Sequence, residues 1–367
     1  MKDLKTAGKG NQNGSSSRVI SLSAASCGQA SGALEVASAF ELAIKELGLE
    51  GKVQLKLTGC HGFCQLEPDI IIFPEKYFYP QVKVEDAKRI LLETGVNGRF
   101  IPELGFQDEI TPNGISRLEE VPFYQDQLRW LIDQQLDLDP LSLEDYLEHG
   151  GFEALESVLS ELSPQEVIGE IMASGLRGRG GAGFSTGLKW KLAREVAAQP
   201  KYIVCNGDEG DPGAYMDRGI LESNPYSVLE GMLIGGYAVG ATKGFIYVRQ
   251  EYPLAIERLD KAMSLLYPAG LLGEKILGTD FSFELELVRG AGAFVSGEET
   301  ALVASIEGRR ANPRQRPPFP VVSGLWGKPT VINNVETWAN IPLIIKNGAA
   351  WFSKTGTDKS KGTKIFS

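Results

Sequence analysis

The apolar positions in the first hundred residues follow two periods, one typical of strands and one typical of helices. Short apolar runs with alternating polarity predict strands, and apolar residues that recur every three or four positions predict helices. In chain order these elements are strand 19–22, helix 33–47, strand 53–57, strand 69–73 and helix 84–94. The order βαββα is typical of a thioredoxin-like α+β domain, which we expect at residues 18–96. Residues 1–17 are polar and rich in Ser and Gly, so we predict a disordered tail there.

The next part of the chain predicts short helices. Helical patterns cover residues 124–135, 142–148 and 151–160. Ser142 and Ser163 carry the hydroxyl that favours the N-cap of a following helix. We interpret residues 97–160 as a helical connector.

The remaining residues alternate between strand, loop and helix, which predicts an α/β domain at 161–350. Its expected strands are 202–206, 245–249 and 281–288, and its expected helices are 227–240, 253–267 and 298–307. The final residues Thr363–Ser367 resemble the opening of another strand. We therefore interpret 351–367 as the start of a truncated C-terminal domain.

A stretch rich in glycine and cations, Gly175–Trp190, carries the clearest chemical signal. Glycine lets backbone N–H groups approach a ligand closely, and Arg179 and Lys189 can bind phosphate by charge-assisted hydrogen bonds. Residues 178–183 match G-x-G-x-x-G, but a Rossmann fingerprint needs a strand immediately before it. Here Pro164–Met172 has helical spacing. The stretch therefore predicts a phosphate-binding loop that follows a helix.

Four further stretches have compositions that suit ligand binding. They are Cys205–Arg218, Gly290–Leu302, Arg314–Pro320 and Pro329–Thr337. The acids of the first would repel phosphate, so we expect them to face sugar hydroxyls, amides or ring nitrogens; a solvated acidic loop is the alternative. The acids of the second either stabilise a helix N-terminus or bind a ribose or ribityl chain. Each stretch alone is a weak signal.

Three cysteines lie in the small N-terminal domain. Cys60 and Cys64 form C-x3-C between two expected strands, and Cys27 follows the first strand. Loops at one end of the domain could gather these thiols for an iron–sulfur cluster, which normally takes four thiolates. Cys205 belongs to the other domain, so the alternative is a set of thiols on a fold that has lost its cluster. His61 is better explained as a loop residue that makes a backbone hydrogen bond than as a ligand.

Charge and composition exclude several classes of function. Lys and Arg number 37 against 47 Asp and Glu, a net charge of −10. This balance argues against nucleic acid or an anionic membrane as the main partner. No apolar run approaches the ~18 residues of a membrane span. The polar N-terminus shows no signal peptide, so we expect a cytoplasmic protein.

Taken together, the five stretches resemble the family of flavin-binding NADH dehydrogenase subunits. This family contains the flavoprotein of respiratory complex I and its relatives in soluble NAD(P)-linked hydrogenases and formate dehydrogenases. The resemblance covers residues 140–367, and residues 18–95 are similar to the thioredoxin-like [2Fe-2S] domain that soluble members carry. It implies an α/β fold, in which a Rossmann-like FMN/NADH-binding domain is preceded by a thioredoxin-like α+β domain and a helical connector.

The resemblance also implies roles for individual residues. Contacts with FMN are implied for Gly178, Arg179, Gly180, Lys189, Asn206, Asp208, Glu209, Phe294, Gly297, Glu298, Glu299, Ile332, Asn333, Asn334 and Thr337. Contacts with NAD(H) or NADP(H) are implied for Phe184, Asp211, Glu299, Arg316 and Phe319. Cluster ligation is implied for Cys27, Cys60 and Cys64.

This sequence departs from the family's pattern in three ways. Ser296 stands where many members have cysteine, and only serines precede Cys27 where the first of four [2Fe-2S] cysteines is usual. The family also continues beyond this C-terminus into a ubiquitin-like domain and a helical domain with a [4Fe-4S] site. We therefore expect flavin reduction to survive and onward electron transfer to be impaired.

The activity implied is oxidation of NAD(P)H by hydride transfer to FMN, followed by single-electron transfer to iron–sulfur centres. We expect the partners to be electron-transfer subunits of a soluble hydrogenase, formate dehydrogenase or bifurcating complex. The alternatives are the NADH-oxidising flavoprotein of complex I and a non-catalytic scaffold of such a complex. Hydride transfer needs no general acid or base, and the chain has only 2 His and no nucleophile–base set.

Overall fold

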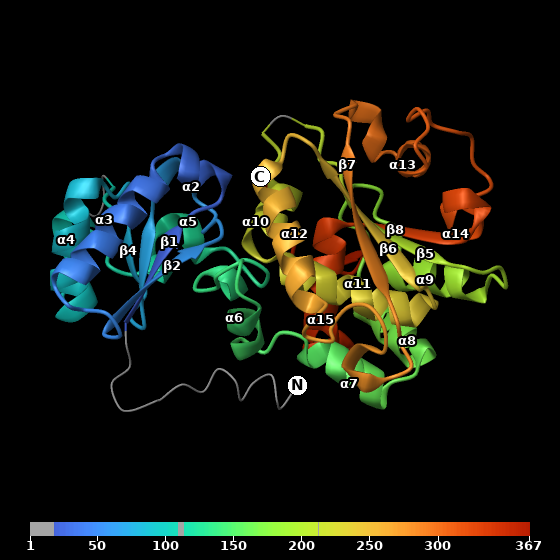
Figure 1. Ribbon diagram of the computed structural model, residues 1–367, viewed down its shortest axis with the longest axis horizontal. Coiled ribbons are helices and arrows are strands. Elements are labelled where there is room, and N and C mark those ends of the chain that lie inside the picture. The colour runs from blue at the N-terminus through green and yellow to red at the C-terminus, as the bar shows by residue number, and fades with distance from the viewer. Residues whose placement is uncertain (1–17, 109–113, 212) are drawn as a thin grey trace. The chain divides into compact units, whose positions relative to one another are not determined.

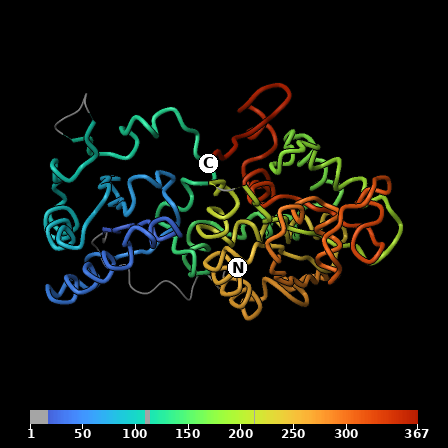
Figure 2. Tube along the Cα trace, turned by 90° about the horizontal axis from the view of Figure 1, so that it is seen from above, coloured from blue at the N-terminus to red at the C-terminus, as the bar shows by residue number. Residues whose placement is uncertain are grey.

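The chain forms two compact units, one within residues 6–142 and the other within 143–367. The structure, a computed structural model, describes residues 18–108, 114–211 and 213–367. Figures 1 and 2 trace the chain from two directions. The predicted tail at 1–17 lies outside the described residues. The boundary between the units falls inside the stretch interpreted as a connector.

A four-stranded mixed sheet forms the centre of the N-terminal unit (Figure 1). Strand β1 pairs in parallel with β2 and antiparallel with β3, and β3 pairs antiparallel with β4. The bounds are β1 Arg18–Ser23, β2 Val53–Thr58, β3 Ile70–Phe73 and β4 Tyr77–Tyr79. This order, β2-β1-β3-β4, confirms the thioredoxin-like fold. Sequence reasoning missed β4, because three residues are too few to show a period.

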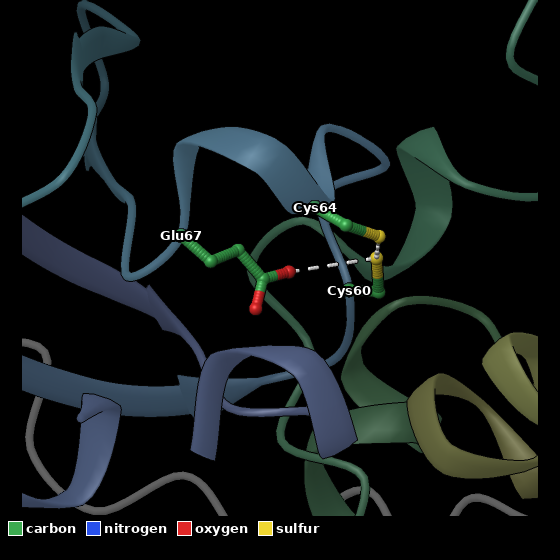
Figure 3. A group of neighbouring side chains, drawn as sticks. All are labelled: Cys60, Cys64 and Glu67. Atoms are coloured by element: carbon green, nitrogen blue, oxygen red, sulfur yellow. Dashed lines mark hydrogen bonds between the residues drawn. The ribbon is translucent and has the colours of Figure 1, made fainter. Parts of the chain in front are cut away.

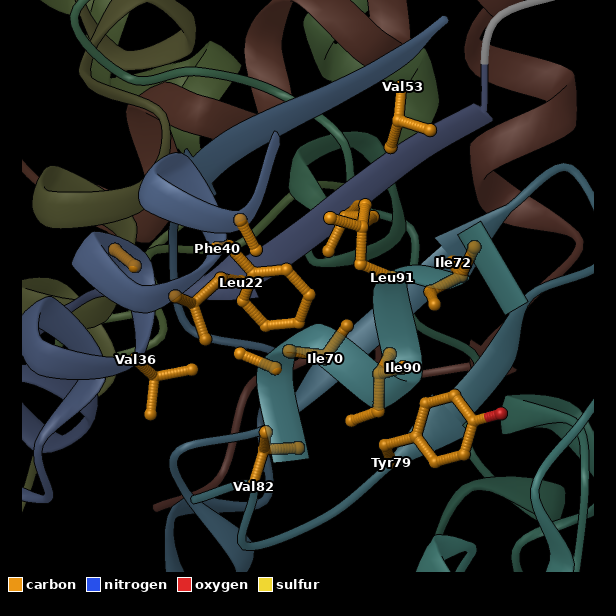
Figure 4. Packing of buried hydrophobic residues seen from close by; sticks show 14 of the residues in the cluster. Leu22, Val36, Phe40, Val53, Ile70, Ile72, Tyr79, Val82, Ile90 and Leu91 are labelled. Carbon is orange, nitrogen blue, oxygen red and sulfur yellow. The ribbon is translucent and has the colours of Figure 1, made fainter. Parts of the chain in front are cut away.

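Helices cover the sheet of this unit and close its core. α2 (Ser26–Ala30) and α3 (Ala33–Glu46) follow β1, and α4 (Ala87–Ile90) follows β4. Apolar residues of α3, the sheet and α4 form one buried cluster (Figure 4). Its labelled members are Leu22, Val36, Phe40, Val53, Ile70, Ile72, Tyr79, Val82, Ile90 and Leu91. The expected helix 84–94 is there divided into a 3-10 turn Val84–Asp86, α4, and a π-helical turn Leu91–Val96.

The predicted amphipathic helix at 124–135 is wrong. The structure has α5 (Pro122–Gln125), then irregular chain, and a 3-10 turn at Asp133–Gln135. Arg129 is buried, lies 4.4 Å over the Tyr124 ring and donates to the carbonyl of His61. A charged residue of this segment is thus buried, whereas an amphipathic helix would place it on the exposed polar face.

Four parallel strands in the order β7-β6-β5-β8 form the sheet of the C-terminal unit (Figure 1). Their bounds are β5 Tyr202–Gly207, β6 Lys243–Arg249, β7 Glu284–Gly290 and β8 Thr330–Asn334. The predicted strands at 202–206 and 245–249 are confirmed, whereas β7 begins three residues later than Phe281, the predicted start. β8 was missed. No strand covers 363–367; the two-residue strands Gly356–Thr357 and Ser360–Lys361 pair just before it.

Helices pack on both faces of this sheet. α11 and α15 pack against each other and against β5, and Leu302 and Val303 of α13 pack with Val204 and Ile332 on the other face. Gly231 of α11 permits the first contact, because a Cβ there would lie 2.1 Å from the carbonyl oxygen of Trp338. The helices are α6 Leu143–Glu148, α7 Glu153–Glu161, α8 Pro164–Ser174, α9 Thr186–Glu195, α10 Met216–Ser223, α11 Pro225–Val239, α12 Pro253–Leu266, α13 Glu299–Ile306, α14 Pro320–Ser323, α15 Val335–Asn347 and α16 Ala349–Ser353. Among the described helices, none combines the length and apolarity of a membrane span.

Two residues anchor the first helices of this unit. Ser163 caps α8 in a capping box with Glu166, as predicted. Glu230 of α11 is fully buried and accepts hydrogen bonds from the Tyr146 hydroxyl at 2.7 Å and from the Phe152 and Leu155 N–H groups at 2.9 and 3.1 Å. Burial raises the pKa of Glu230. One carboxyl therefore joins α6 and α7 to α11.

The substitution Glu230→Ala tests this joint. It leaves two buried N–H donors without an acceptor, at about 1–3 kcal/mol each, so we expect a loss of roughly 3 kcal/mol in the free energy of unfolding. Denaturant titration measures it. Glu257 of α12 is exposed, and Glu257→Ala is the control, expected within about 0.5 kcal/mol of the wild type. Equal unfolding midpoints for the two variants would contradict the assignment.

Candidate functional site

Loops at the carboxyl edge of the parallel sheet enclose a cavity of about 520 Å³. Parallel strands end at the same edge of a sheet, and α/β domains bind ligands there. The lining residues are Arg179, Gly180, Asn206, Asp208, Glu209, Gly210, Asp211, Ala214, Met216, Asp217, Phe294, Val295, Gly297, Glu298 and Asn334. Four of the five stretches singled out in the sequence therefore meet at one cavity; the Arg314–Pro320 stretch contributes no lining residue.

The glycine-rich loop runs from α8 to α9 as a closed hairpin. Gly178 N–H donates to the Phe184 carbonyl at 2.9 Å, and a bridge pairs Arg177 with Ser185. Gly181 and Gly183 have φ of +96° and +64°, a region that disfavours side chains. A helix, not a strand, precedes the loop, which confirms the prediction that it is no Rossmann turn.

Arg179 anchors this loop to the end of the chain. Its guanidinium donates to the carbonyls of Lys361 and Thr363 at 2.7 and 2.9 Å. Its Nε lies 3.7 Å from the Glu336 carboxylate, and its backbone N–H donates to the Thr337 hydroxyl at 2.9 Å. The bond to Thr363 uses a backbone carbonyl of the segment 363–367, where a strand was predicted. Burial raises the pKa of Glu336 to about 7.

The loop after β5 is held by its own polar side chains. The Asn206 amide donates to the Gly297 carbonyl at 3.0 Å and accepts from Asp208 N–H at 3.0 Å, so it joins the loops of β5 and β7. Asp208 pairs with Arg249 at 3.0 Å, and burial raises the pKa of this carboxyl. Glu209 accepts three N–H bonds, at 2.9–3.2 Å, from the first turn of α10. The acidic loop is thus a folded wall of the cavity rather than a solvated segment.

Of the five lining residues that the predicted site set omitted, Asp217 is the one with an ionisable side chain; the others are Gly210, Ala214, Met216 and Val295. The Asp217 Oδ2 accepts from the Asn334 amide at 2.6 Å, and its Oδ1 is buried without a hydrogen-bond partner in the described part of the chain. Burial, and then the nearby Glu209 charge, raise the pKa of Asp217 well above its usual value. Its place in an acid-rich stretch after a strand was the available signal, but a buried orientation cannot be read from sequence.

The loop after β7 uses its two acids differently. Glu298 caps α13, accepting from the N–H groups of Thr300 and Ala301 at 2.8 and 3.0 Å. Burial opposes ionisation of Glu298, but these bonds hold its pKa below the usual value. Glu299 accepts from Lys189 at 2.9 Å and lies 3.5 Å from Arg316.

Several predicted residues lie outside the cavity lining. They are Gly178, Phe184, Lys189, Glu299, Arg316, Phe319, Ile332, Asn333 and Thr337. Lys189 also donates to the Ile332 carbonyl at 2.9 Å, so both lie beside the cavity wall. Asn333 is buried. Phe184 and Phe319 are about half exposed, and Arg316 lies 5.9 Å over the Phe319 ring.

A second group of possible ligands lies in the N-terminal unit (Figure 3). The Cys60 Sγ lies 4.0 Å from the Cys64 Sγ and 3.7 Å from Oε1 of Glu67. Cys27 is not a member of this group, although we predicted that it would bind a cluster together with the other two cysteines. None of the four cysteines, all of them described, forms a disulfide. Burial raises the pKa of Glu67 to about 8.

His61 does not point to the cysteines. Its imidazole is buried between Asp69, at 3.0 Å from Nδ1, and Ser21 and Thr58, at 3.1 and 3.0 Å from Nε2. His61 is not among the grouped donors, in keeping with the interpretation that it is no ligand. We predicted a hydrogen bond from its side chain to the backbone, but the imidazole bonds to other side chains instead.

Comparison with known proteins finds a family model that matches part of the C-terminal unit and several relatives that are similar to part of the chain. Residues 171–343 match the family described as the Nuo51 FMN-binding domain. The NADP-reducing hydrogenase protein HndC of Solidesulfovibrio fructosivorans is 58% identical over 229 residues, which are 62% of this chain and 46% of that protein. A component of the NADH-quinone oxidoreductase of Escherichia coli (strain K12) is 48% identical over 230 residues, 62% of this chain and 52% of that protein.

One solved structure extends the likeness to both units. A chain of an NAD+-reducing [NiFe]-hydrogenase in the H2-reduced state is similar over 96% of this chain and 56% of its own length, with a TM-score of 0.55 and 27% identity. This chain spans about half the length of the curated relatives it matches. Residues 171–343, somewhat less than half of this chain, are thus similar to the Nuo51 FMN-binding domain.

Proposed function

We propose that this chain is the electron-input flavoprotein of a soluble, cytoplasmic multi-subunit oxidoreductase. It oxidises NADH or NADPH with FMN as cofactor and passes electrons singly to iron–sulfur centres of partner subunits. The observation that carries the proposal is the cavity at the carboxyl edge of the parallel sheet, where loops from four separate stretches meet. The family match over the same residues supports it.

The residues of the cavity fit FMN chemically. A volume of about 520 Å³ lies within the range of small-molecule sites, about 300–1,000 Å³. The buried, unpartnered Oδ1 of Asp217 can accept from a ring N–H or a ribityl hydroxyl. The glycine-rich loop offers backbone N–H groups to a phosphate, and its residues Arg179 and Gly180 line the cavity. Polar acceptors and an anion-binding loop are thus both present.

The protein's own part in the reaction is positioning. When bound, FMN accepts a hydride and releases electrons one at a time, which is chemistry that no side chain supplies. Asn206, Asp208 and Glu209 fix the loop after β5 through the bonds described above, so the cavity wall is preorganised. Phe184, Arg316 and Phe319, exposed outside the cavity, are proposed to bind the dinucleotide by stacking and charge. Asp211 is proposed to contact its ribose.

A hydrogenase-type complex is favoured over complex I by two observations. The likeness to the NAD+-reducing hydrogenase chain covers both units of this protein, and the hydrogenase relative HndC is 58% identical against 48% for the NADH-quinone oxidoreductase relative, each over 62% of the chain. The flavoprotein of complex I stays the second candidate. A non-catalytic scaffold is the third, and FMN binding by the purified chain would exclude it.

Substitution of Asn206 tests the FMN site. Asn206→Ala removes one hydrogen bond to the loop after β7 and one within the loop after β5, together worth about 1–2 kcal/mol, so we expect a roughly tenfold higher Kd for FMN. Quenching of flavin fluorescence measures it. Asn347 is exposed near the end of α15, and Asn347→Ala should leave the Kd unchanged. The same Kd for all three proteins, or no binding by the wild type, would contradict the site.

Substitution of Phe184 tests the proposed dinucleotide face. A lost aromatic stack costs about 1 kcal/mol, so Phe184→Ala should raise the KM for NADH roughly five- to tenfold with a dye acceptor. The Kd for FMN should stay that of the wild type, because only the Phe184 backbone closes the loop. Leu192→Ala, at an exposed apolar residue of α9, is the control. An unchanged KM would remove Phe184 from the dinucleotide site.

A further inference from the structure

The three donor atoms of the N-terminal unit come from one short segment. Cys60 lies in the loop after β2, Cys64 opens the 3-10 turn Cys64–Leu66, and Glu67 follows that turn, three residues before β3 begins. The Sγ atoms of the cysteines and a carboxylate oxygen of Glu67 all lie within 4.8 Å of one another. Figure 3 shows the Glu67 carboxylate and the Cys64 thiol both directed at the Cys60 sulfur.

These distances are those of adjacent ligands on a tetrahedral ion. With Zn–S of about 2.3 Å and Zn–O of about 2.0–2.2 Å, the edges of such a site are about 3.8 Å between sulfurs and about 3.5 Å between sulfur and oxygen. The observed separations are 4.0 Å and 3.7 Å. A disulfide would need about 2.05 Å. The geometry is therefore that of two thiolates and a carboxylate around one cation.

A second observation points to a ligand independently of these distances. Glu67 is only 6% exposed, and its Oε2 is buried without a hydrogen-bond partner among the residues described. Its Oε1 accepts from the Ser23 hydroxyl at 2.9 Å, which fixes the direction of the carboxylate. The Gly62 N–H donates to the Cys60 sulfur at 3.2 Å, as outer-shell donors do at metal thiolates. The oxygen that faces the Cys60 sulfur, Oε1, is therefore held in position to bind a cation.

A [2Fe-2S] cluster of the usual kind does not fit this donor set. Such a cluster takes four thiolates, but the N-terminal unit has only three cysteines, and the group of neighbouring donors adds an oxygen. Two sulfurs with one oxygen suit Zn²⁺, whereas Mg²⁺ and Ca²⁺ prefer oxygen ligands throughout. The Ser23 hydroxyl does not supply a further ligand, because it donates its hydrogen bond to the Glu67 carboxylate and so orients it.

We propose that Cys60, Cys64 and Glu67 bind a single Zn²⁺ ion at the position where a thioredoxin-like ferredoxin domain would hold its cluster. The ion closes the segment between β2 and β3 into a rigid loop. Solvent takes the fourth coordination position, because the group has no fourth protein donor in the described residues and Cys64 is exposed. This site makes the N-terminal unit redox-inert, and it does not depend on the FMN cavity.

The test is metal binding by the full chain, stripped with a chelator and titrated with Zn²⁺ or Co²⁺. We expect one Zn²⁺ per chain, and a Co²⁺ form with the visible bands of a tetrahedral ion and a sulfur-to-cobalt charge-transfer band. Cys60→Ser or Cys64→Ser should weaken binding by roughly 100-fold or more and reduce the charge-transfer band to about half its intensity, because one thiolate remains. Glu67→Gln should weaken binding by about tenfold or more and keep that band, because the thiolates remain.

Two matched variants serve as controls in the same unit. Cys27→Ser and Glu50→Gln, the latter at an exposed residue, should bind Zn²⁺ with the wild-type Kd. Circular dichroism shows which variants fold; should the serine variants fail, the near-isosteric Glu67→Gln decides the question alone. Unchanged affinity in Glu67→Gln, loss of binding in Cys27→Ser, or iron with inorganic sulfide in the purified chain would overturn the proposal. None of these results alters the test of FMN binding.

Discussion

The parallel pairing of β5 with β8 is the constraint on which the candidate cofactor site depends. Its register sets Cys205 opposite Asn333 and Asn206 opposite Asn334, so the two strands end together. The loops that follow must then share one edge of the sheet. Asn206 bonds across to Gly297, and Asn334 bonds to Asp217, which turns this shared edge into a closed wall. A shift of register would separate these partners.

Many polar side chains around the cavity form hydrogen bonds to the protein backbone, and these bonds fix the loops in place. Arg179 bonds to the carbonyls of Lys361 and Thr363, and Glu209 caps α10. Residues that resemble ligand contacts by type can therefore act by fixing backbone, with glycine N–H groups left to meet the ligand. Among the described cavity residues, one oxygen of Asp217 and the Nε of Arg179 are buried without a hydrogen-bond partner.

Elements with a clear period of apolar residues were predicted correctly from the sequence. The predictions were wrong where contacts between distant residues determine the local structure. The strands at 202–206 and 245–249 and the helix Pro253–Leu266 are continuous apolar or amphipathic runs. The helix predicted at 124–135 is absent because Arg129 is buried under His61 and Tyr124, a contact that no local pattern encodes. The glycine-rich loop was recognisable by composition. The sequence could not predict that one oxygen of Asp217 is buried without a hydrogen-bond partner, or that the Glu67 carboxylate lies beside Cys60, because both depend on the tertiary structure.

Reduction of bound flavin by a nicotinamide dinucleotide tests the central claim most directly. The full chain, loaded with FMN and freed of excess cofactor, would be titrated with NADH and then NADPH without oxygen while the flavin absorbance is recorded. The account predicts that one of the two bleaches the flavin stoichiometrically. A chain that retains no FMN, or whose bound FMN neither dinucleotide reduces, would contradict it.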